Sequence, residues 1–340
     1  MVKIMGVEEK IELVKRNTAE IIGEKDLNEL VKSKKEPSCY IGTAPTGVPH
    51  VGYFVWGLKV ADLLRAGFRV KILLADLHAA LDNTPWEILE ERYKFYSKII
   101  PLMIESMGAD VSKLEFIKGS DFEMSKEYVS DLYKIASITS VNDCHRAASE
   151  VVKLGETPKL SGYLYPLLQA LDEEYLKVDV QFGGLDQRKI LMFARENLPK
   201  IGFDARVEVM NPMIPGLVGK KMSSSDAKTK IDFVDGADEV KKKINKADCV
   251  EGNPDNGVMA FLKYVIMVIK SDAGEKFVVE RDEKYGGNVE YEDYGNIEQD
   301  FIKKKLHPMD LKIAVAKEIS ELLGKADIKK LEKLSEKAYE

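Results

Sequence analysis

Short apolar runs alternate with longer stretches of helical pattern over the first two-thirds of the chain. The apolar runs cover residues 39–43, 70–75, 114–117 and 178–182, and their composition is typical of strands. Because strands that alternate with helices form parallel sheets with crossover connections, this pattern predicts an α/β domain.

The pattern changes after residue 226. Amphipathic helices are predicted over residues 238–246, 259–269, 310–323 and 328–339, so a separate helical domain is expected to follow the sheet. Residues 277–281 and 288–292 are expected to pair as a small hairpin near Gly286 and Gly287. A chain of 340 residues has room for both parts, since single cores rarely grow past roughly 250 residues.

Composition narrows the class of protein. Charged residues interrupt the first 22 positions, and no apolar run is long enough to span a bilayer, so we expect a cytoplasmic protein without a membrane segment. The three cysteines form no C-x-x-C pair and the four histidines are far apart in sequence, which supports neither a disulfide framework nor a zinc site. No metal is therefore predicted, apart from Mg²⁺ that arrives with a nucleotide.

The net charge of −6 argues against a protein that binds nucleic acid over its whole surface. Local basic clusters nevertheless occur at residues 241–243 with Lys246, and at residues 303–305. One such face could meet a phosphate backbone. Alternatively, these lysines form solvated helix faces that neighbouring acids balance.

A Gly- and Pro-rich loop, residues 42–49, joins the first strand to a helix predicted from about His50 to Arg65. Backbone N–H groups at a helix start favour phosphate, a His can donate to its oxygens, and a nearby Gly leaves room for an adenine ring. The candidates are Thr46, His50, Gly52 and Tyr53. A His near a helix start is also commonly a capping or surface residue, and four residues alone do not decide between the two.

A second candidate for phosphate binding is the segment Gly219-Lys220-Lys221-Met222-Ser223-Ser224-Ser225. Two lysines beside consecutive small hydroxyl residues make a polar loop that can close over phosphates and neutralise charge on a departing pyrophosphate. A lysine followed by serines is also common in linkers. The position of this segment at the junction of the two predicted domains favours the phosphate clamp.

A third set of polar side chains shares one face of a predicted helix. Tyr165, Gln169 and Asp172 follow one another at spacings of four and three. They form either a buried binding stripe or the solvated face of an ordinary amphipathic helix. The next strand ends in Gly183-Gly184, followed by Asp186 and Gln187, and strand ends of this kind bind ligands in open α/β sheets, where an Asp can accept from sugar hydroxyls.

The segments His50-Val51-Gly52-Tyr53 and Lys221-Met222-Ser223-Ser224-Ser225 resemble the two nucleotide-binding motifs of class I aminoacyl-tRNA synthetases, in the right order and separation. The resemblance implies a Rossmann-type catalytic domain, with ATP and Mg²⁺ as substrate and no permanent cofactor. Catalytic roles then fall to His50, Thr46, Lys221 and Ser224, and ATP contacts to Gly52, Tyr53, Gly184, Asp186, Met222, Ser223 and Ser225. Tyr53 and Ser224 stand where the class usually has His and Lys. Because Ser224 removes a cation, we hypothesise that Mg²⁺ or another cation supplies part of that charge.

The stretches around Asp172 and Asp186, with Tyr40 in the first strand, resemble the tyrosyl branch of this class in its archaeal and eukaryotic form. The implied substrate contacts are Tyr40 and Asp172 for the phenol, and Tyr165, Gln169 and Gln187 for the amino and carboxylate groups. A site built to satisfy a hydroxyl refuses phenylalanine by a factor of about 10⁴ to 10⁵, so no editing domain is required. Asp76 and His78 either line the same crevice or make structural hydrogen bonds.

Residues 306–312 resemble the anticodon-reading segment of the family, in which Asp310, close to His307, contacts the first anticodon base. A carboxylate can accept from the N–H edge of guanine. Asp310 would also make a good helix N-cap, so both interpretations stay open.

The resemblance divides the chain into an N-terminal helical segment (residues 1–30), a catalytic domain (31–225) and a helical anticodon-binding domain (226–340). It also implies a homodimer, with its contact in an insertion at about residues 120–159, and tRNA(Tyr), L-tyrosine and ATP as partners. The alternatives are a tryptophanyl enzyme of the same architecture, a small-molecule nucleotidyltransferase and a non-catalytic RNA-binding relative. The Tyr40 and Asp172 pair weighs against the first, the helical domain against the second, and the intact motifs against the third.

Overall fold

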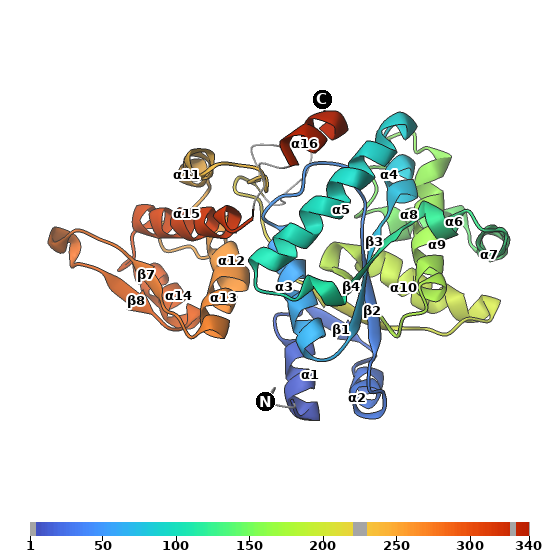
Figure 1. The fold of residues 1–340 in the computed structure, drawn as a ribbon, viewed down its shortest axis with the longest axis horizontal. Coiled ribbons are helices and arrows are strands. Elements are labelled where there is room, and N and C mark those ends of the chain that lie inside the picture. Colours follow the sequence, from blue (N-terminus) through green and yellow to red (C-terminus); the bar gives the residue numbers. More distant parts are fainter. Residues whose placement is uncertain (1–4, 220–229, 327–330, 340) are drawn as a thin grey trace.

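A six-stranded sheet forms the centre of the protein in the computed structural model, which describes residues 5–219, 230–326 and 331–339 (Figure 1). Its strands are β1 (Glu20–Ile22), β2 (Ser38–Thr43), β3 (Arg69–Leu74), β4 (Leu114–Lys118), β5 (Val180–Gly184) and β6 (Val207–Asn211). Their order is β1-β6-β5-β2-β3-β4, and all neighbours are parallel except β1, which pairs antiparallel with β6. The strand order reverses beside β2, and this is the point at which open α/β sheets bind ligands.

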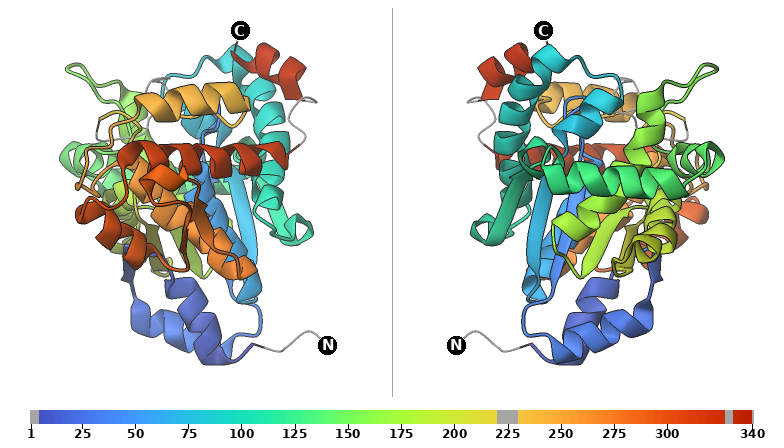
Figure 2. Two further views of the ribbon diagram at one scale, coloured as in Figure 1. Left: turned by 90° about the vertical axis from the view of Figure 1, so that its left-hand side faces the viewer. Right: turned by 90° about the vertical axis from the view of Figure 1, so that its right-hand side faces the viewer.

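Helices cover both faces of this sheet (Figures 1 and 2). α3 (Tyr53–Arg65) and α5 (Leu89–Ser106) pack on one face, whereas α9 (Leu160–Tyr175) and α10 (Arg188–Asn197) lie on the other. Phe54, Leu58 and Ile99 belong to the main core, and Leu171 and Phe193 belong to a second core beside α9 and α10. The remaining elements are α1 (Val7–Lys15), α2 (Glu24–Ser33), α4 (Asp76–Leu81), α6 (Ser120–Glu123), α7 (Lys126–Ile138), α8 (Val141–Ala148) and the short turns η1 (Trp86–Ile88), η2 (Val111–Lys113), η3 (Leu185–Gln187) and η4 (Leu198–Ile201).

The chain is mainly helical after residue 230. The elements are α11 (Ala237–Lys246), α12 (Gly257–Phe261), the π-helical turn η5 (Leu262–Ile266), α13 (Met267–Ala273), η6 (Glu283–Tyr285), α14 (Tyr294–Ile302), α15 (Pro308–Gly324) and α16 (Glu332–Tyr339). The strands β7 (Phe277–Val279) and β8 (Val289–Tyr291) pair antiparallel, which confirms the predicted hairpin. Buried residues of α12 and α15 share one core cluster with the sheet, and α16 returns to pack on α5 (Figure 1).

Four of the six sheet strands agree with the sequence-based predictions, with small shifts at their ends. β1 and β6 escape prediction, because β1 is three residues long and lies in a segment expected to be helical, and β6 carries the buried charged residue Glu208. The helix after β2, α3, begins at Tyr53 rather than at the predicted His50. His50 instead forms an isolated β-bridge with Asp232. Within the described ranges, no helix is both long and apolar enough to cross a bilayer.

Candidate active site

A cavity of about 670 Å³ opens at the carboxyl ends of β2, β5 and β6. Thr43, Gly184 and Asn211, the last residues of these strands, all line it. The predicted nucleotide-binding residues that line this large cavity are Thr46, His50, Gly52, Tyr53, Gly184 and Asp186. His50, Gly52 and Tyr53 of the first motif therefore line one space at the switch point of the sheet.

The loop between β2 and α3 is held by two other helices. Arg92 of α5 donates to the carbonyl of Thr46, and the Tyr96 hydroxyl of the same helix donates to the carbonyl of Gly47. Tyr339 of α16 donates to the Gly47 carbonyl as well, at 2.9 Å. These contacts anchor one wall of the large cavity on α5 and on the C-terminal helix.

His50 is neutral and presents a single N–H group. Its Nδ1 accepts a hydrogen bond from the Gly52 backbone N–H at 3.2 Å, which assigns the ring proton to Nε2. Burial, with a smaller effect from the charge of Lys230, lowers the pKa of His50 to about 4. In this cavity the ring is therefore a hydrogen-bond donor to an anionic oxygen rather than a positive charge.

A smaller cavity of about 30 Å³ adjoins the large one. The residues that line both cavities are Gly42, Ala44, Tyr165 and Gln187, and those that line only the small one are Tyr40, Leu73, Ala75, His78, Gln169 and Asp172. All of the residues predicted to contact the amino acid thus line one space. That space shares a wall with the large cavity that His50 lines, so the two predicted ends of the site are contiguous.

Tyr165, Gln169 and Asp172 lie on α9, as their spacing predicts. The Gln169 side-chain amide donates to the Gln187 side-chain oxygen at 2.9 Å, and the Tyr165 ring meets the His78 ring edge-on with centroids 4.7 Å apart. The alternative of a solvated polar face is wrong, because Gln169 is 8% and Asp172 only 1% exposed.

Asp172 is a buried acceptor at the end of the small cavity. Its Oδ1 lies 2.8 Å from the Tyr128 hydroxyl, whereas its Oδ2 has no hydrogen-bond partner in the described part of the chain. The Tyr40 hydroxyl makes only a long contact of 3.4 Å, to the carbonyl of Gln169. A carboxylate oxygen without a partner and a weakly bonded phenol in one cavity suit a ligand that carries a hydroxyl group.

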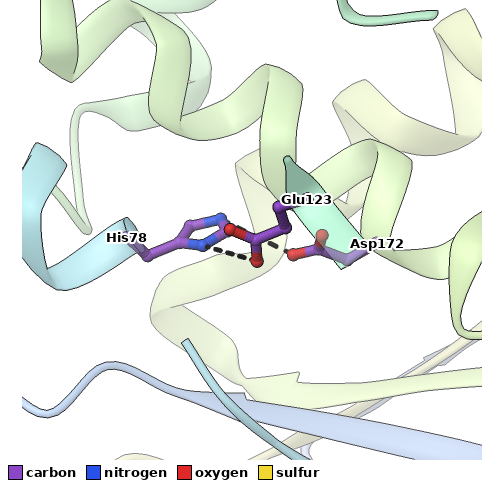
Figure 3. Close-up of side chains that lie close together, drawn as sticks. All are labelled: His78, Glu123 and Asp172. Carbon is purple, nitrogen blue, oxygen red and sulfur yellow. Dashed lines mark ion pairs between the residues drawn. The ribbon is translucent and has the colours of Figure 1, made fainter. Parts of the chain in front are cut away.

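His78 contacts two carboxylates, each through a different ring nitrogen (Figure 3). Its Nε2 is 3.6 Å from Asp172 Oδ2, and its Nδ1 is 3.6 Å from Glu123 Oε1. Burial alone would lower the pKa of His78, but the charges of Glu123 and Asp172 outweigh it and raise that pKa. Burial, reinforced by the charge of Glu123, raises the pKa of Asp172 well above its usual range.

Asp76 and His78 were each predicted either to line the crevice or to make structural hydrogen bonds, and the two residues differ. His78 lines the small cavity. The Asp76 carboxylate instead accepts hydrogen bonds from Ser120, at 2.9 Å from the backbone N–H and at 2.6 Å from the hydroxyl. Asp76 therefore fixes the start of α6, which carries Glu123.

Three side chains lie close to the two glycines at the end of β5. A Cβ atom on Gly184 would lie 2.5 Å from Asp186 Oδ1 and 3.3 Å from Met213 Sδ, and one on Gly183 would lie 3.0 Å from Gln187 Oε1. The glycines therefore let the side chains of Asp186 and Gln187 lie against the strand end.

The remaining predicted residues lie elsewhere. Lys221, Met222, Ser223, Ser224 and Ser225 fall outside the described residues. In α15, the prediction that Asp310 caps the helix is wrong: His307 is the N-cap, its Nδ1 accepting from the Met309 backbone N–H at 3.2 Å, and Asp310 lies in the first turn.

Several residues of the site carry little signal in the sequence. Tyr128 and Glu123 belong to the segment expected to form a subunit contact, yet Tyr128 donates to Asp172 and a Glu123 oxygen lies within 4.8 Å of an Asp172 oxygen. Asn83 and Lys153 line the large cavity from loops. Asn83 has a positive φ of 71°, so the Asn-Thr-Pro turn is the one pattern that marks this wall.

Two sets of side chains are candidates for metal binding. Donor atoms of His78, Glu123 and Asp172 lie within 4.8 Å of one another. However, each acid contacts a different ring nitrogen of His78 at 3.6 Å, so the three side chains form ion pairs with one another in this structure. Asp82 and Asp186 line the large cavity and supply the oxygen atoms that Mg²⁺ prefers, so this cavity fits Mg²⁺ carried by a phosphate chain.

Comparison with known proteins assigns this architecture to a family. The model of the "tRNA synthetases class I (W and Y)" matches residues 32–324. This chain belongs to that family. As a class I tRNA synthetase, it is 49% identical over 98% of its length to cytoplasmic tyrosine–tRNA ligase from Gallus gallus, and 43% identical over 94% to tyrosine–tRNA ligase from Haloarcula marismortui. The crystal structure of tyrosyl-tRNA synthetase complexed with L-tyrosine from Archaeoglobus fulgidus superimposes with a TM-score of 0.87 at 40% identity, covering 94% of this chain and 98% of that one.

These similarities confirm the predicted family, the tyrosyl branch with archaeal and eukaryotic relatives, and the Rossmann-type fold of this class I synthetase. The chain spans about 64% of the length of the Gallus gallus relative and 93% of the Haloarcula marismortui relative.

Proposed function

We propose that this synthetase is a cytoplasmic tyrosine–tRNA ligase. It would activate L-tyrosine with ATP to tyrosyl-adenylate and then transfer the tyrosine to the 3′ end of tRNA(Tyr) for translation. The observation that carries the proposal is the junction of the two cavities, one lined by Tyr40 and Asp172 and the other by His50. Relatives named tyrosine–tRNA ligase, one of them cytoplasmic, support the same reaction.

The small cavity would hold the phenol. Asp172 Oδ2, which has no hydrogen-bond partner within the described ranges, accepts from the substrate O–H, while the Tyr40 hydroxyl donates to the same phenol oxygen. Tyr165, Gln169 and Gln187 then hold the amino and carboxylate groups where the two cavities meet. Phenylalanine would leave both phenol-binding groups without a partner, which is the physical basis for its rejection.

The large cavity would hold ATP with its phosphates near His50. The tyrosine carboxylate attacks the α-phosphorus in line, a P–O bond forms, and the bond to pyrophosphate breaks. The 3′-terminal ribose hydroxyl of the tRNA then attacks the acyl carbon, and AMP leaves. No protein nucleophile takes part, so catalysis rests on positioning and on charge stabilisation.

Named residues would share this work. The His50 Nε2–H donates to a phosphate oxygen, and Thr46, Lys221 and Ser224 act on the same phosphate chain. Mg²⁺ bound with the nucleotide would neutralise part of the triphosphate charge. The adenosine contacts are proposed for Gly52, Tyr53, Gly184, Asp186, Met222, Ser223 and Ser225.

Dimerisation and tRNA binding extend the proposal. Exposed apolar side chains occur in the insertion at about residues 120–159, where Met124, Tyr133 and Val141 are 69%, 71% and 65% exposed. Exposed apolar groups favour a contact between subunits, so we propose a homodimer through this segment. The helical domain, from residue 226, would read the anticodon through Asp310 and His307.

Amino-acid-dependent ATP–pyrophosphate exchange with each of the twenty standard amino acids tests the proposal. We expect exchange with tyrosine alone, followed by charging of tRNA(Tyr). Exchange with tryptophan would favour the tryptophanyl alternative. No exchange with any amino acid would favour the non-catalytic RNA-binding alternative.

A further inference from the structure

The reaction proposed above leaves one buried acid beside Asp172 without a role. We propose that Glu123 is a positioning residue which, through His78, sets the pH range over which Asp172 accepts the phenol of the substrate. This inference rests on the proposed tyrosine specificity and deepens it, because it assigns a residue behind the cavity to the control of substrate binding.

Glu123 is placed to act on the cavity without lining it. Its side chain is 3% exposed, and neither carboxylate oxygen has a hydrogen-bond partner among the residues described. Its Oε1 lies 3.6 Å from His78 Nδ1, and the other ring nitrogen lies at the same distance from Asp172 Oδ2 (Figure 3). Gly119 leaves room for the Glu123 carboxylate, because a Cβ at position 119 would lie 2.5 Å from Glu123 Oε1.

His78 is the cation that these two carboxylates share. No Lys or Arg makes an ion pair with Glu123 or Asp172 in the ranges that the structure describes, so the imidazole alone offsets them. The other titratable groups that face the cluster are Tyr40 from β2, Asp76 from α4, Tyr128 from α7, and Tyr165 and Glu173 from α9. The acids among them and the phenols add no positive charge.

The negative charge of Glu123 acts in the same direction on both neighbours. It favours the protonated form of His78, and it disfavours ionisation of Asp172, so it raises the pKa of each. Tyrosine binding needs an ionised Asp172, and it therefore weakens as pH falls through the pKa of that carboxyl. Binding weakens again at high pH, when His78 loses its proton and no longer holds the carboxylate.

Glu123→Gln keeps the side-chain shape and removes the charge. The measurement is the Kd of L-tyrosine across the pH range, with thermal unfolding of each variant at every pH. Affinity should fall on an acid limb, at low pH, and on an alkaline limb, at high pH. We expect both limbs to move to lower pH by about one to three units in Glu123→Gln. Near the alkaline limb of the wild type, the variant should bind tyrosine at least about tenfold more weakly, and near the acid limb more tightly.

Three further variants isolate the cause. Asp131→Asn removes a carboxylate on α7 that accepts from the Tyr175 hydroxyl at 2.7 Å and makes no contact with His78, so its profile should match the wild type. His78→Asn should abolish the alkaline limb, and adding Glu123→Gln to His78→Asn should then leave the affinity at high pH unchanged. Glu123→Asp retains the charge and should restore most of the wild-type profile, which covers the case in which Glu123→Gln folds poorly.

A loss of tyrosine affinity by the same factor at every pH would overturn the inference, since a structural role alone has that signature. Competition between tyrosine and added Zn²⁺ that disappears in Glu123→Gln would also overturn it, in favour of a metal site. If the wild type binds no tyrosine at any pH, the proposed function itself fails. Tyrosine binding by the wild type with an unmoved profile in Glu123→Gln rejects only the role of Glu123.

Discussion

The substitution Tyr40→Phe should weaken recognition of tyrosine with little effect on the stability of the free protein. The Tyr40 hydroxyl contacts the Gln169 carbonyl at 3.4 Å, which is long for a hydrogen bond, so its removal should cost the free protein less than about 1 kcal/mol. In the proposed complex the same hydroxyl donates to the substrate phenol. Leaving that phenol oxygen without its partner costs about 1–3 kcal/mol, which corresponds to an approximately 5- to 150-fold loss for tyrosine.

The assay is ATP–pyrophosphate exchange with tyrosine and with phenylalanine, reported as kcat/KM for each. Phenylalanine has no hydroxyl to lose a contact, so the tyrosine-to-phenylalanine ratio should fall by the same factor of about 5 to 150. Tyr175→Phe is the matched control, because its hydroxyl donates to Asp131 at 2.7 Å and lines neither cavity. Equal losses for both amino acids in Tyr40→Phe would refute the assignment of this hydroxyl to the phenol.

Three further changes test other parts of the account. His50→Gln should slow adenylate formation by about 2–4 kcal/mol in the barrier while tyrosine affinity stays unchanged, as measured by rapid quench and equilibrium binding; a parallel loss in both would contradict the role of His50. Because the pKa of His50 lies at about 4, the wild-type rate should show no titration of this group between about pH 6 and pH 9. Burial would raise the pKa of Asp272, but hydrogen bonds from Arg16 and Arg65 outweigh it and lower that pKa, so this stabilisation is present above about pH 4 and is lost as pH falls through the folded value. Asp272→Asn should therefore lower the free energy of unfolding in urea by about 1 kcal/mol at neutral pH and by less in acid; a pH-independent loss would count against the ion pairs. Gly257→Ala should destabilise the fold by about 1–3 kcal/mol, because its Cβ would lie 2.5 Å from the Gly216 carbonyl oxygen. Gly324→Ala, whose Cβ would have no atom of the described residues within 4 Å, should be neutral or slightly stabilising in thermal unfolding.

Local pattern predicted the parts of the fold in which each element shows its own periodicity. The strands β2 to β5 are apolar runs flanked by helices, and α9 shows its polar face through the spacing of Tyr165, Gln169 and Asp172. β1 and β6 pair with each other at the edge, and each is too short or too mixed in polarity to stand out. Their positions follow from pairing partners far away in sequence, which a local pattern does not contain.

The site likewise contains residues that local patterns predict and residues that they do not. Residues at strand ends and helix starts, such as Gly184 and Gly52, follow from rules about where ligands bind in open sheets. Tyr128 and Glu123 reach Asp172 only because α6 and α7 fold back on α9, so no spacing along the chain connects them. His307 rather than Asp310 caps α15, and the rule that favours Asp at this position does not include His.

A crystal structure with a non-hydrolysable analogue of tyrosyl-adenylate tests the central claim most directly. The account predicts that the phenol lies between Tyr40 and Asp172, with its hydroxyl within hydrogen-bond distance of Asp172 Oδ2, and that the phosphate lies near His50 Nε2. A bound analogue whose aromatic ring lies outside the small cavity, or whose phosphate lies away from His50, would contradict it.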